Sequence, residues 1–276
     1  MDNIKEYVSK FTTFGIPIDY KGLKIKPVLV KDAELFLDVV EVFRIEKNKI
    51  PSIEIIQMSY LEFLMGMIAI NQDYLNAFLA LLSLTLGMQY DESYKKEGDT
   101  FAPNELLSQK INDKNSFYYI NGWDIEVVVC NGKASINIMG TTLTSSEFDV
   151  FRHIVLFQNI ADYDDIEMSD DFRRVVEQYY ALKFKGIHDP TLEEKMLAII
   201  MSTSYTIESL AQVPLRSFDK LFDYSVKKAD YIATKPLEPH LKEGCSIDHW
   251  VFYPERDRFA DVFGDPEEVT KKVTNT

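Results

Sequence analysis

Alternating apolar and polar positions near the start of the chain predict a β-hairpin over residues 14–30. Apolar residues alternate with polar ones on both sides of Lys21 and Gly22, most clearly over residues 23–26. A period of two is typical of a strand with one buried face. Pro27 lacks an amide hydrogen, so we expect the second strand to lie at an edge.

The pattern then changes to the period of an α-helix. Apolar residues recur every three or four positions over residues 33–45, and Asp32 is placed to cap this helix. Two apolar helices are predicted over 53–70 and 72–88, joined near Asn71. Polar residues interrupt this stretch, whereas a membrane-spanning helix needs about 20 apolar residues. We therefore expect two buried helices and no membrane partner.

Strand patterns return in the middle of the chain. Two Asn-Gly dipeptides separate three β-rich segments. Asn-Gly favours the type I′ turn of a hairpin, because both of its central residues need a positive φ. The sequence therefore predicts a three-stranded antiparallel meander over residues 117–120, 123–130 and 134–139. The polar residues 89–116 before it are predicted to be a loop or a short helix.

The remainder of the chain is predicted to be helical. Thr144 with Glu147, and Thr191 with Glu194, have the spacing of capping boxes, in which each pair satisfies free backbone amides at a helix start. The predicted helices cover residues 145–159, 170–185, 192–204, 206–213 and 215–234.

These patterns together predict an α+β fold. It is mostly helical, with an N-terminal β-hairpin and a central three-stranded antiparallel meander. We expect a single composite domain over residues 1–250 and an acidic tail over 251–276. The alternative is a division at the polar stretch into 1–90, with the hairpin and helices, and 117–235, with the meander and a helical bundle.

Composition and charge narrow the choice of partners. The chain has 276 residues and a net charge of −14, so its surface repels phosphates and nucleic acid is not an expected partner. Apolar residues make up 46 %, which is enough for a sizeable core. The two cysteines, Cys130 and Cys245, argue against a disulfide scaffold and fit a reducing compartment. The first residues lack the pattern of a secretory signal.

Two clusters contain residue types that bind metal ions. The acids from Asp162 to Asp171 do not follow the calcium-loop template, because the sixth position is Glu rather than Gly and the twelfth is Arg rather than Glu. His240, Cys245 and His249 supply three zinc ligands where a structural site takes four. The favoured interpretations are a solvated loop and a tail packed against the body, so no metal or cofactor is predicted.

Motifs of catalysis are missing from the sequence. It contains no glycine-rich phosphate loop and no Gly-x-Ser-x-Gly elbow. Cys130 and His153 are of the types found in nucleophilic pairs, but nothing local indicates that they meet. A pair of carboxylates for acid–base catalysis, brought together from distant segments, stays an open possibility. We expect a protein that is not an enzyme, with no catalytic residues.

The apolar stripes of the two helices over 53–88 have two interpretations. One is the hydrophobic core, and the other is a groove for a partner helix. Methionines suit an adaptable groove, and an acidic rim selects a basic helix. The candidate partner-binding residues are Tyr60, Phe63, Leu64, Met67, Phe78 and Leu82.

Several segments resemble proteins of tailed bacteriophages that infect low-GC Gram-positive bacteria. These are residues 20–28, 47–51, 58–64, 146–149 and 217–222, together with His249 and Trp250. The similarity is to uncharacterised proteins of the tail-morphogenesis region and contains no catalytic signature. Residues 255–276 depart from it.

The resemblance implies a tail assembly chaperone in the host cytoplasm that binds the tape-measure or tail-tube protein. Such a partner, helical and basic, suits an acidic binder. One alternative is a structural component of the baseplate or connector, which stays in the virion. Another is a phage-encoded inhibitor of, or enzyme acting on, a host process. The sequence leaves the oligomeric state open.

Overall fold

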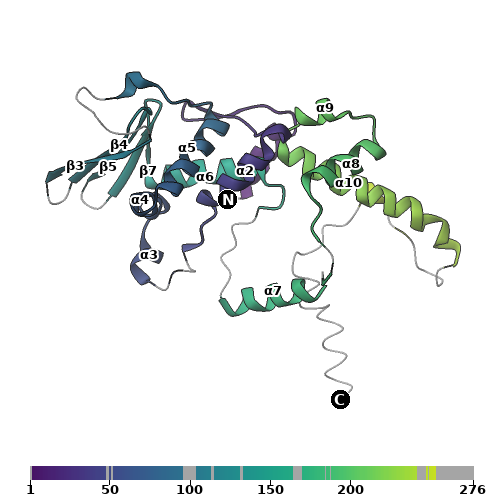
Figure 1. Ribbon diagram of the computed structural model, residues 1–276. Helices are drawn as coiled ribbons and strands as arrows, with labels where there is room; N and C mark the ends of the chain where they lie inside the picture. The colour runs from purple at the N-terminus through teal and green to yellow at the C-terminus, as the bar shows by residue number, and fades with distance from the viewer. Residues whose placement is uncertain are drawn as a thin grey trace, which may run out of the picture. The chain divides into compact units, whose positions relative to one another are not determined.

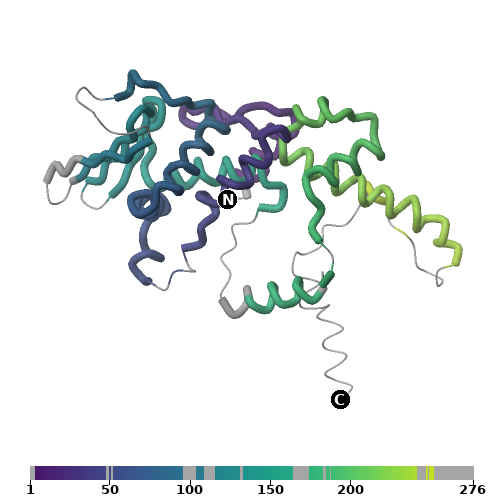
Figure 2. Tube along the Cα trace, viewed as in Figure 1, coloured from purple at the N-terminus to yellow at the C-terminus, as the bar shows by residue number. Residues whose placement is uncertain are grey.

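The structure is a computed structural model of the chain. It describes residues 2–47, 50, 52–95, 104–112, 115–130, 133–163, 170–183, 185–186, 188–240, 247 and 249–252. They belong to an α+β fold with more helix than strand (Figures 1 and 2). The chain divides into two compact units. Unit 1 comprises Met1–Tyr163 with Ile207–Asp219, and unit 2 comprises Asp164–Thr206 with Lys220–Thr276. Whether these units fold independently is not tested. The single domain expected over residues 1–250 therefore stays a prediction, and so does the alternative division into 1–90 and 117–235.

Backbone hydrogen bonds attach residues 207–219 to unit 1. The amide of Leu215 donates to the carbonyl of Val28 over 2.8 Å, and the amide of Val30 donates to the carbonyl of Val213 over 3.0 Å. The short helix α9 (Ile207–Ala211) lies in this segment, as the sequence predicted.

The central sheet of unit 1 is larger than predicted. Its antiparallel strands follow the order β3-β4-β5-β6-β7. The expected three strands correspond to β4, β5 and β6, and β3 and β7 extend the meander on both sides. The sequence predicted a loop or helix at β3 because only three of its seven residues are apolar. The strands are β3 (Leu106–Asn112), β4 (Asn115–Ile120), β5 (Ile125–Cys130), β6 (Lys133–Ile138) and β7 (Thr141–Thr144).

The first Asn-Gly pair forms a turn, but not the expected type I′ turn. Only Gly122 has a positive φ, of 80°, and the amide of Trp123 donates to the carbonyl of Ile120 over 3.0 Å. This combination is typical of a type II turn, within a connection of four residues between β4 and β5. The second pair, at residues 131–132, lies outside the described residues.

The N-terminal hairpin is confirmed, but its strands are shorter than the expected range of residues 14–30. Strands β1 (Ile18–Tyr20) and β2 (Leu23–Ile25) are antiparallel, and Lys21 and Gly22 between them both have positive φ angles, of 55° and 93°. Two positive φ angles are what a type I′ turn requires. The preceding helix, α1 (Asp2–Thr12), was not predicted, and it packs against α6 (Ser145–Asn159).

The predicted helices of unit 1 form with corrected boundaries. The helix expected over 33–45 is α2 (Ala33–Val39) followed by a 3-10 turn, and the side chain of Asp32 makes no capping hydrogen bond. The helix expected over 53–70 is interrupted, because Ser59 forms a capping box with Glu62 and starts a new helix. The resulting helices are α3 (Ile53–Gln57), α4 (Tyr60–Ile70) and α5 (Gln72–Leu86).

Helix α6 lies at the centre of the core of unit 1. Its capping box at Thr144 and Glu147 is confirmed, and every residue of 151–159 is buried. One face of the sheet packs on α6 and α4, beside α5 (Figure 1). Phe43 packs edge-on against Phe148 and Phe151 from α6, with ring centres 5.9 and 6.1 Å apart.

Unit 2 is helical. It contains α7 (Asp170–Lys183), α8 (Leu192–Ser202) with the predicted capping box at Thr191, and most of α10 (Leu215–Thr234). The ring of Trp250 lies 6.1 Å from that of Tyr224, and the ring of His249 lies 4.9 Å from that of Tyr231. The aromatic residues of the tail therefore pack on α10.

Candidate functional site

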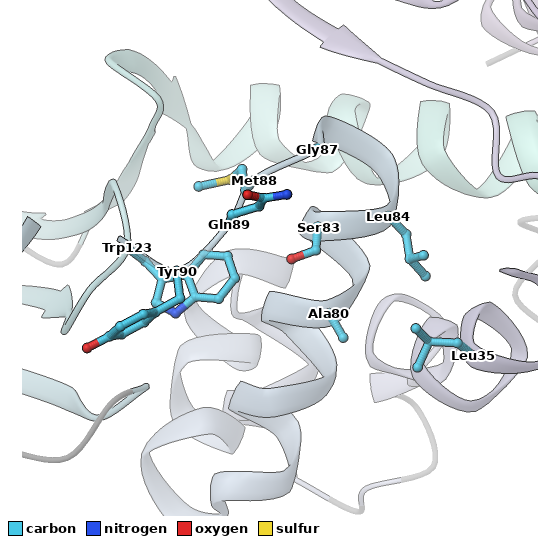
Figure 3. Close-up of a pocket in the computed structure, with 9 residues that line it drawn as sticks. All are labelled: Leu35, Ala80, Ser83, Leu84, Gly87, Met88, Gln89, Tyr90 and Trp123. Carbon is cyan, nitrogen blue, oxygen red and sulfur yellow. The ribbon is translucent and has the colours of Figure 1, made fainter. Parts of the chain in front are cut away.

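A pocket of about 460 Å³ opens on unit 1 (Figure 3). Leu35 of α2 forms one side, and Ala80, Ser83 and Leu84 of α5 form the other. Residues 87–90 and Trp123 of the turn after β4 complete the lining. Most of these side chains are apolar, and none is a carboxylate, an imidazole, a thiol or an amine.

Helix α5 presents two apolar faces, of which one lines the pocket. Ala80, Ser83 and Leu84 are three and four positions apart and so share one side of the helix. Its core side carries Leu75, Phe78 and Leu82, which are fully buried. Gly87 ends the helix in the left-handed conformation, with a φ of 75°, which turns the chain along the edge of the pocket.

The aromatic wall of the pocket depends on a close approach to Gly122. An added Cβ at this residue would lie 1.9 Å from Cε2 of Tyr90, so the tyrosine ring rests directly on the glycine backbone. The amide of Asp91 also donates to the carbonyl of Gly122 over 2.9 Å. Trp123 is fixed by its indole N–H, which donates to Oδ1 of Asn104 over 2.6 Å.

Acidic side chains flank the pocket. Glu34 and Asp38 are exposed on either side of Leu35 along α2, and Asp91 is exposed next to Tyr90. The backbone amide of Ser93 donates to the Asp91 carboxylate, which lowers the pKa of that carboxyl and keeps it ionised.

Two lysines reach the same region. Lys95 forms an ion pair with Glu92 over 3.3 Å. The Nζ of Lys26 lies 3.3 Å from the position of an added Cβ at Gly87. The carboxylates near the pocket still outnumber these two ammonium groups. They are those of Glu34, Asp38, Asp91, Glu92 and Asp124.

The structure places most of the sequence-derived candidates in the core. Five of the six are at most 7 % exposed, and only Met67 is half-buried. Helix α4 packs against α6, and helix α5 packs against η2 (Val40–Phe43). The wide apolar stripes of α4 and α5 are therefore buried in the core, as the first of the two interpretations expected. The buried five, which offer a partner almost no surface, are Tyr60, Phe63, Leu64, Phe78 and Leu82.

None of the six candidates lines the pocket. Sequence reasoning missed Leu35, Ala80 and Leu84, although one signal was available. Helix α5 is apolar on nearly all sides. Its second apolar side was therefore expected to be either buried in the core or part of a binding surface.

A buried charged network lies on α6. Arg152 is 7 % exposed, and its guanidinium donates to the carbonyl of Phe43 over 2.8 Å and to the carboxylate of Asp149 over 2.9 Å. The same group lies 4.1 Å from the ring centre of Tyr60. Burial lowers the pKa of Arg152, but the charge of Asp149 and other neighbours outweighs this effect, so the pKa is raised and the group stays charged.

The histidine of this network has a fixed role. Nε2 of His153 lies 3.0 Å from Arg152, which can only donate, so Nε2 is the acceptor and Nδ1–H donates to the carbonyl of Asp149 over 2.7 Å. Both ring nitrogens are therefore engaged in a buried residue, which removes the basis for a nucleophilic pair with Cys130. The network attaches α6 to η2 and α4 and is structural.

The metal-binding candidates are only partly described. Asp162 is exposed, residues 164–169 lie outside the described residues, and so does Cys245. Within the described part of the chain, no three His, Cys, Asp or Glu side chains are grouped so that they could hold a metal ion. Within the same part, none of the helices combines the length and the apolar character that crossing a membrane requires.

Comparison with known proteins finds no match to this chain among protein families, curated proteins or solved structures. The functional argument therefore rests on the residues themselves. The pocket offers exposed apolar surface with acidic neighbours, whereas the buried network has its reactive groups occupied.

Proposed function

We propose that this chain is a non-enzymatic assembly protein of a tailed bacteriophage. In this proposal it acts in the host cytoplasm and binds another phage protein, the tape-measure or tail-tube protein, during tail morphogenesis. The resemblance described above supplies the biological setting. The pocket between α2 and α5 supplies the physical basis, because it is the observation that favours protein binding.

The exposed apolar side chain of Leu35 supports a binding role. Leu35 is 50 % exposed at the pocket, although its neighbour Phe36 is fully buried. Covering Leu35 with an apolar partner surface releases the water that now contacts it, which favours association. The lining offers no acid, base or nucleophile beyond hydroxyl groups, which fits binding better than catalysis.

Purified virions and infected-cell lysate provide the test. We would express the tagged full chain during infection, capture it from lysate, and quantify it in purified particles by mass spectrometry. The proposal expects capture of the tape-measure or tail-tube protein and absence of the chain from finished particles.

Each other result assigns a different role. Stoichiometric presence in virions would overturn the chaperone role in favour of a baseplate or connector component. Absence from virions together with capture of a host protein would overturn both assembly roles. It would make an inhibitor of, or enzyme acting on, a host process the leading candidate.

A further inference from the structure

We propose that the pocket between α2 and α5 binds one basic amphipathic α-helix of the partner protein. This inference rests on the proposed function and adds the site and the chemistry of the partner. Two facing helices with apolar side chains in a groove form the arrangement that accepts a third helix by its apolar stripe.

The apolar contact would centre on Leu35 and Leu84. Leu35 is 50 % exposed on α2, and Leu84 faces it from α5 across the pocket (Figure 3). Tyr90 and Trp123 form the end wall and are held in place by Gly122 and by the hydrogen bond to Asn104. The half-buried Tyr90 supplies the accessible surface of this wall, because Trp123 is only 8 % exposed. A rigid aromatic wall loses little conformational entropy on binding, which makes it a suitable anchor.

Charge selects a basic helix. Glu34 and Asp38 are exposed beside Leu35, and neither forms an ion pair with any residue that the structure describes. Asp91 adds an ionised carboxylate at the aromatic wall. Lysines and arginines flanking an apolar stripe would meet these three acids at the rim of the groove.

The same charges argue against other occupants. A second copy of this chain carries a net charge of −14 and the same acidic rim, so its approach is repelled. An acidic or neutral helix would gain apolar contacts and no attraction at the rim. A small apolar molecule would gain no attraction from the flanking carboxylates, which are exposed to solvent.

A matched pair of leucines on α2 tests the site. Leu35 and Leu37 are 50 % and 54 % exposed on the same helix, but only Leu35 lines the pocket. We would measure binding of a fluorescent Leu/Lys amphipathic peptide of about five helical turns to the full chain by anisotropy. Three full-length variants would be compared with the unaltered chain, namely Leu35→Ser, Leu84→Ser and Leu37→Ser, each checked by circular dichroism.

Leu35→Ser and Leu84→Ser are each expected to raise the Kd about fivefold, because each removes roughly half of a leucine contact. Leu37→Ser should change the Kd by less than about twofold. The charge-reversed Leu/Glu peptide should not bind, and a scrambled Leu/Lys peptide should bind more weakly than the amphipathic one. Neutralising the rim with Glu34→Gln and Asp38→Asn should weaken binding at low salt and matter little at high salt.

Equal effects at Leu35 and Leu37, or none at either, would overturn the site, because binding would then not depend on the side chain that lines the pocket. Equal binding of the Leu/Glu peptide would overturn the basic partner. A dimer that only Leu35→Ser dissociates would assign the groove to a second copy.

Failure of the inference and failure of the proposed function can be told apart. If a phage partner is captured but its affinity for the chain is insensitive to Leu35→Ser, the proposed function is supported and the proposed binding site is wrong. If the Leu/Lys peptide binds as expected and no phage protein is captured, the site stands and the phage role falls.

Discussion

Replacing Gly122 by Ala tests how the wall of the pocket is built. The new Cβ would lie 1.9 Å from the ring of Tyr90, so the ring must retreat by about 1.5 Å to reach an ordinary contact of 3.4 Å. Gly140→Ala is a matched control, because Gly140 has a φ of 75° against 80° for Gly122 and nothing within 4 Å of an added Cβ.

The magnitude follows from two contributions. A non-glycine residue at positive φ costs about 1 kcal/mol, and this cost is shared by both variants. Displacing Tyr90 exposes about 80 Å² of apolar surface, which costs about 2 kcal/mol more. We therefore expect Gly122→Ala to lower the free energy of unfolding by about 3 kcal/mol and Gly140→Ala by about 1 kcal/mol.

Urea unfolding followed by tryptophan fluorescence provides the assay. The chain has two tryptophans, one in each unit, so a Trp250→Phe background leaves Trp123 as the reporter of unit 1. In a Tyr90→Ala background the ring is gone, and Gly122→Ala should then cost only the backbone contribution of about 1 kcal/mol. The reasoning would be refuted if Gly122→Ala and Gly140→Ala lowered the free energy of unfolding equally. It would also be refuted if Gly122→Ala were as costly in the Tyr90→Ala background as in the unaltered chain.

Three further predictions concern other parts of the fold. Arg152→Met leaves a buried carbonyl and imidazole without their donor, and should lower the stability of unit 1 by about 2–3 kcal/mol in the same urea assay. The ion pair with Lys21 and the capping box lower the pKa of Glu147 to about 2, so the stability it provides is present above pH 4.5 and lost as the pH falls toward 2. Glu147→Gln should remove that part of the acid dependence of the melting temperature, and an unchanged acid profile would contradict this. Thr191→Ala removes the N-cap of α8 and should cost unit 2 about 1 kcal/mol, measured by the fluorescence of Trp250.

Elements defined by neighbouring residues were predictable from the sequence. The capping boxes at Thr144 and Thr191 place a side-chain acceptor three residues from the amide it satisfies, so four residues decide where each helix begins. The hairpin at Lys21 and Gly22 is local in the same way. The strand pattern of β4 to β6 was also visible, because alternating apolar residues face a helix layer whatever that layer contains.

Elements that depend on distant partners were not predictable. Strand β3 has few apolar residues and forms its ladder with β4, and the Asn121-Gly122 turn lies against the ring of Tyr90, which comes from outside the sheet. The break between α3 and α4 at Ser59 is an exception. It could have been predicted from the sequence, because the capping box of Ser59 with Glu62 is local. The burial of Arg152 was not predictable, because its acceptor at the carbonyl of Phe43 lies 109 positions away in the chain, on η2.

The candidate site shows the same division. The sequence alone determined that α4 and α5 are apolar helices of an acidic chain, and it predicted a basic partner for any exposed part of them. Only the tertiary structure decided that Phe78 and Leu82 face the core while the half-buried Ala80 and Leu84 line the pocket. The reason is physical. Apolarity is a property of each residue, but the side of a helix that meets water depends on which other elements pack against it.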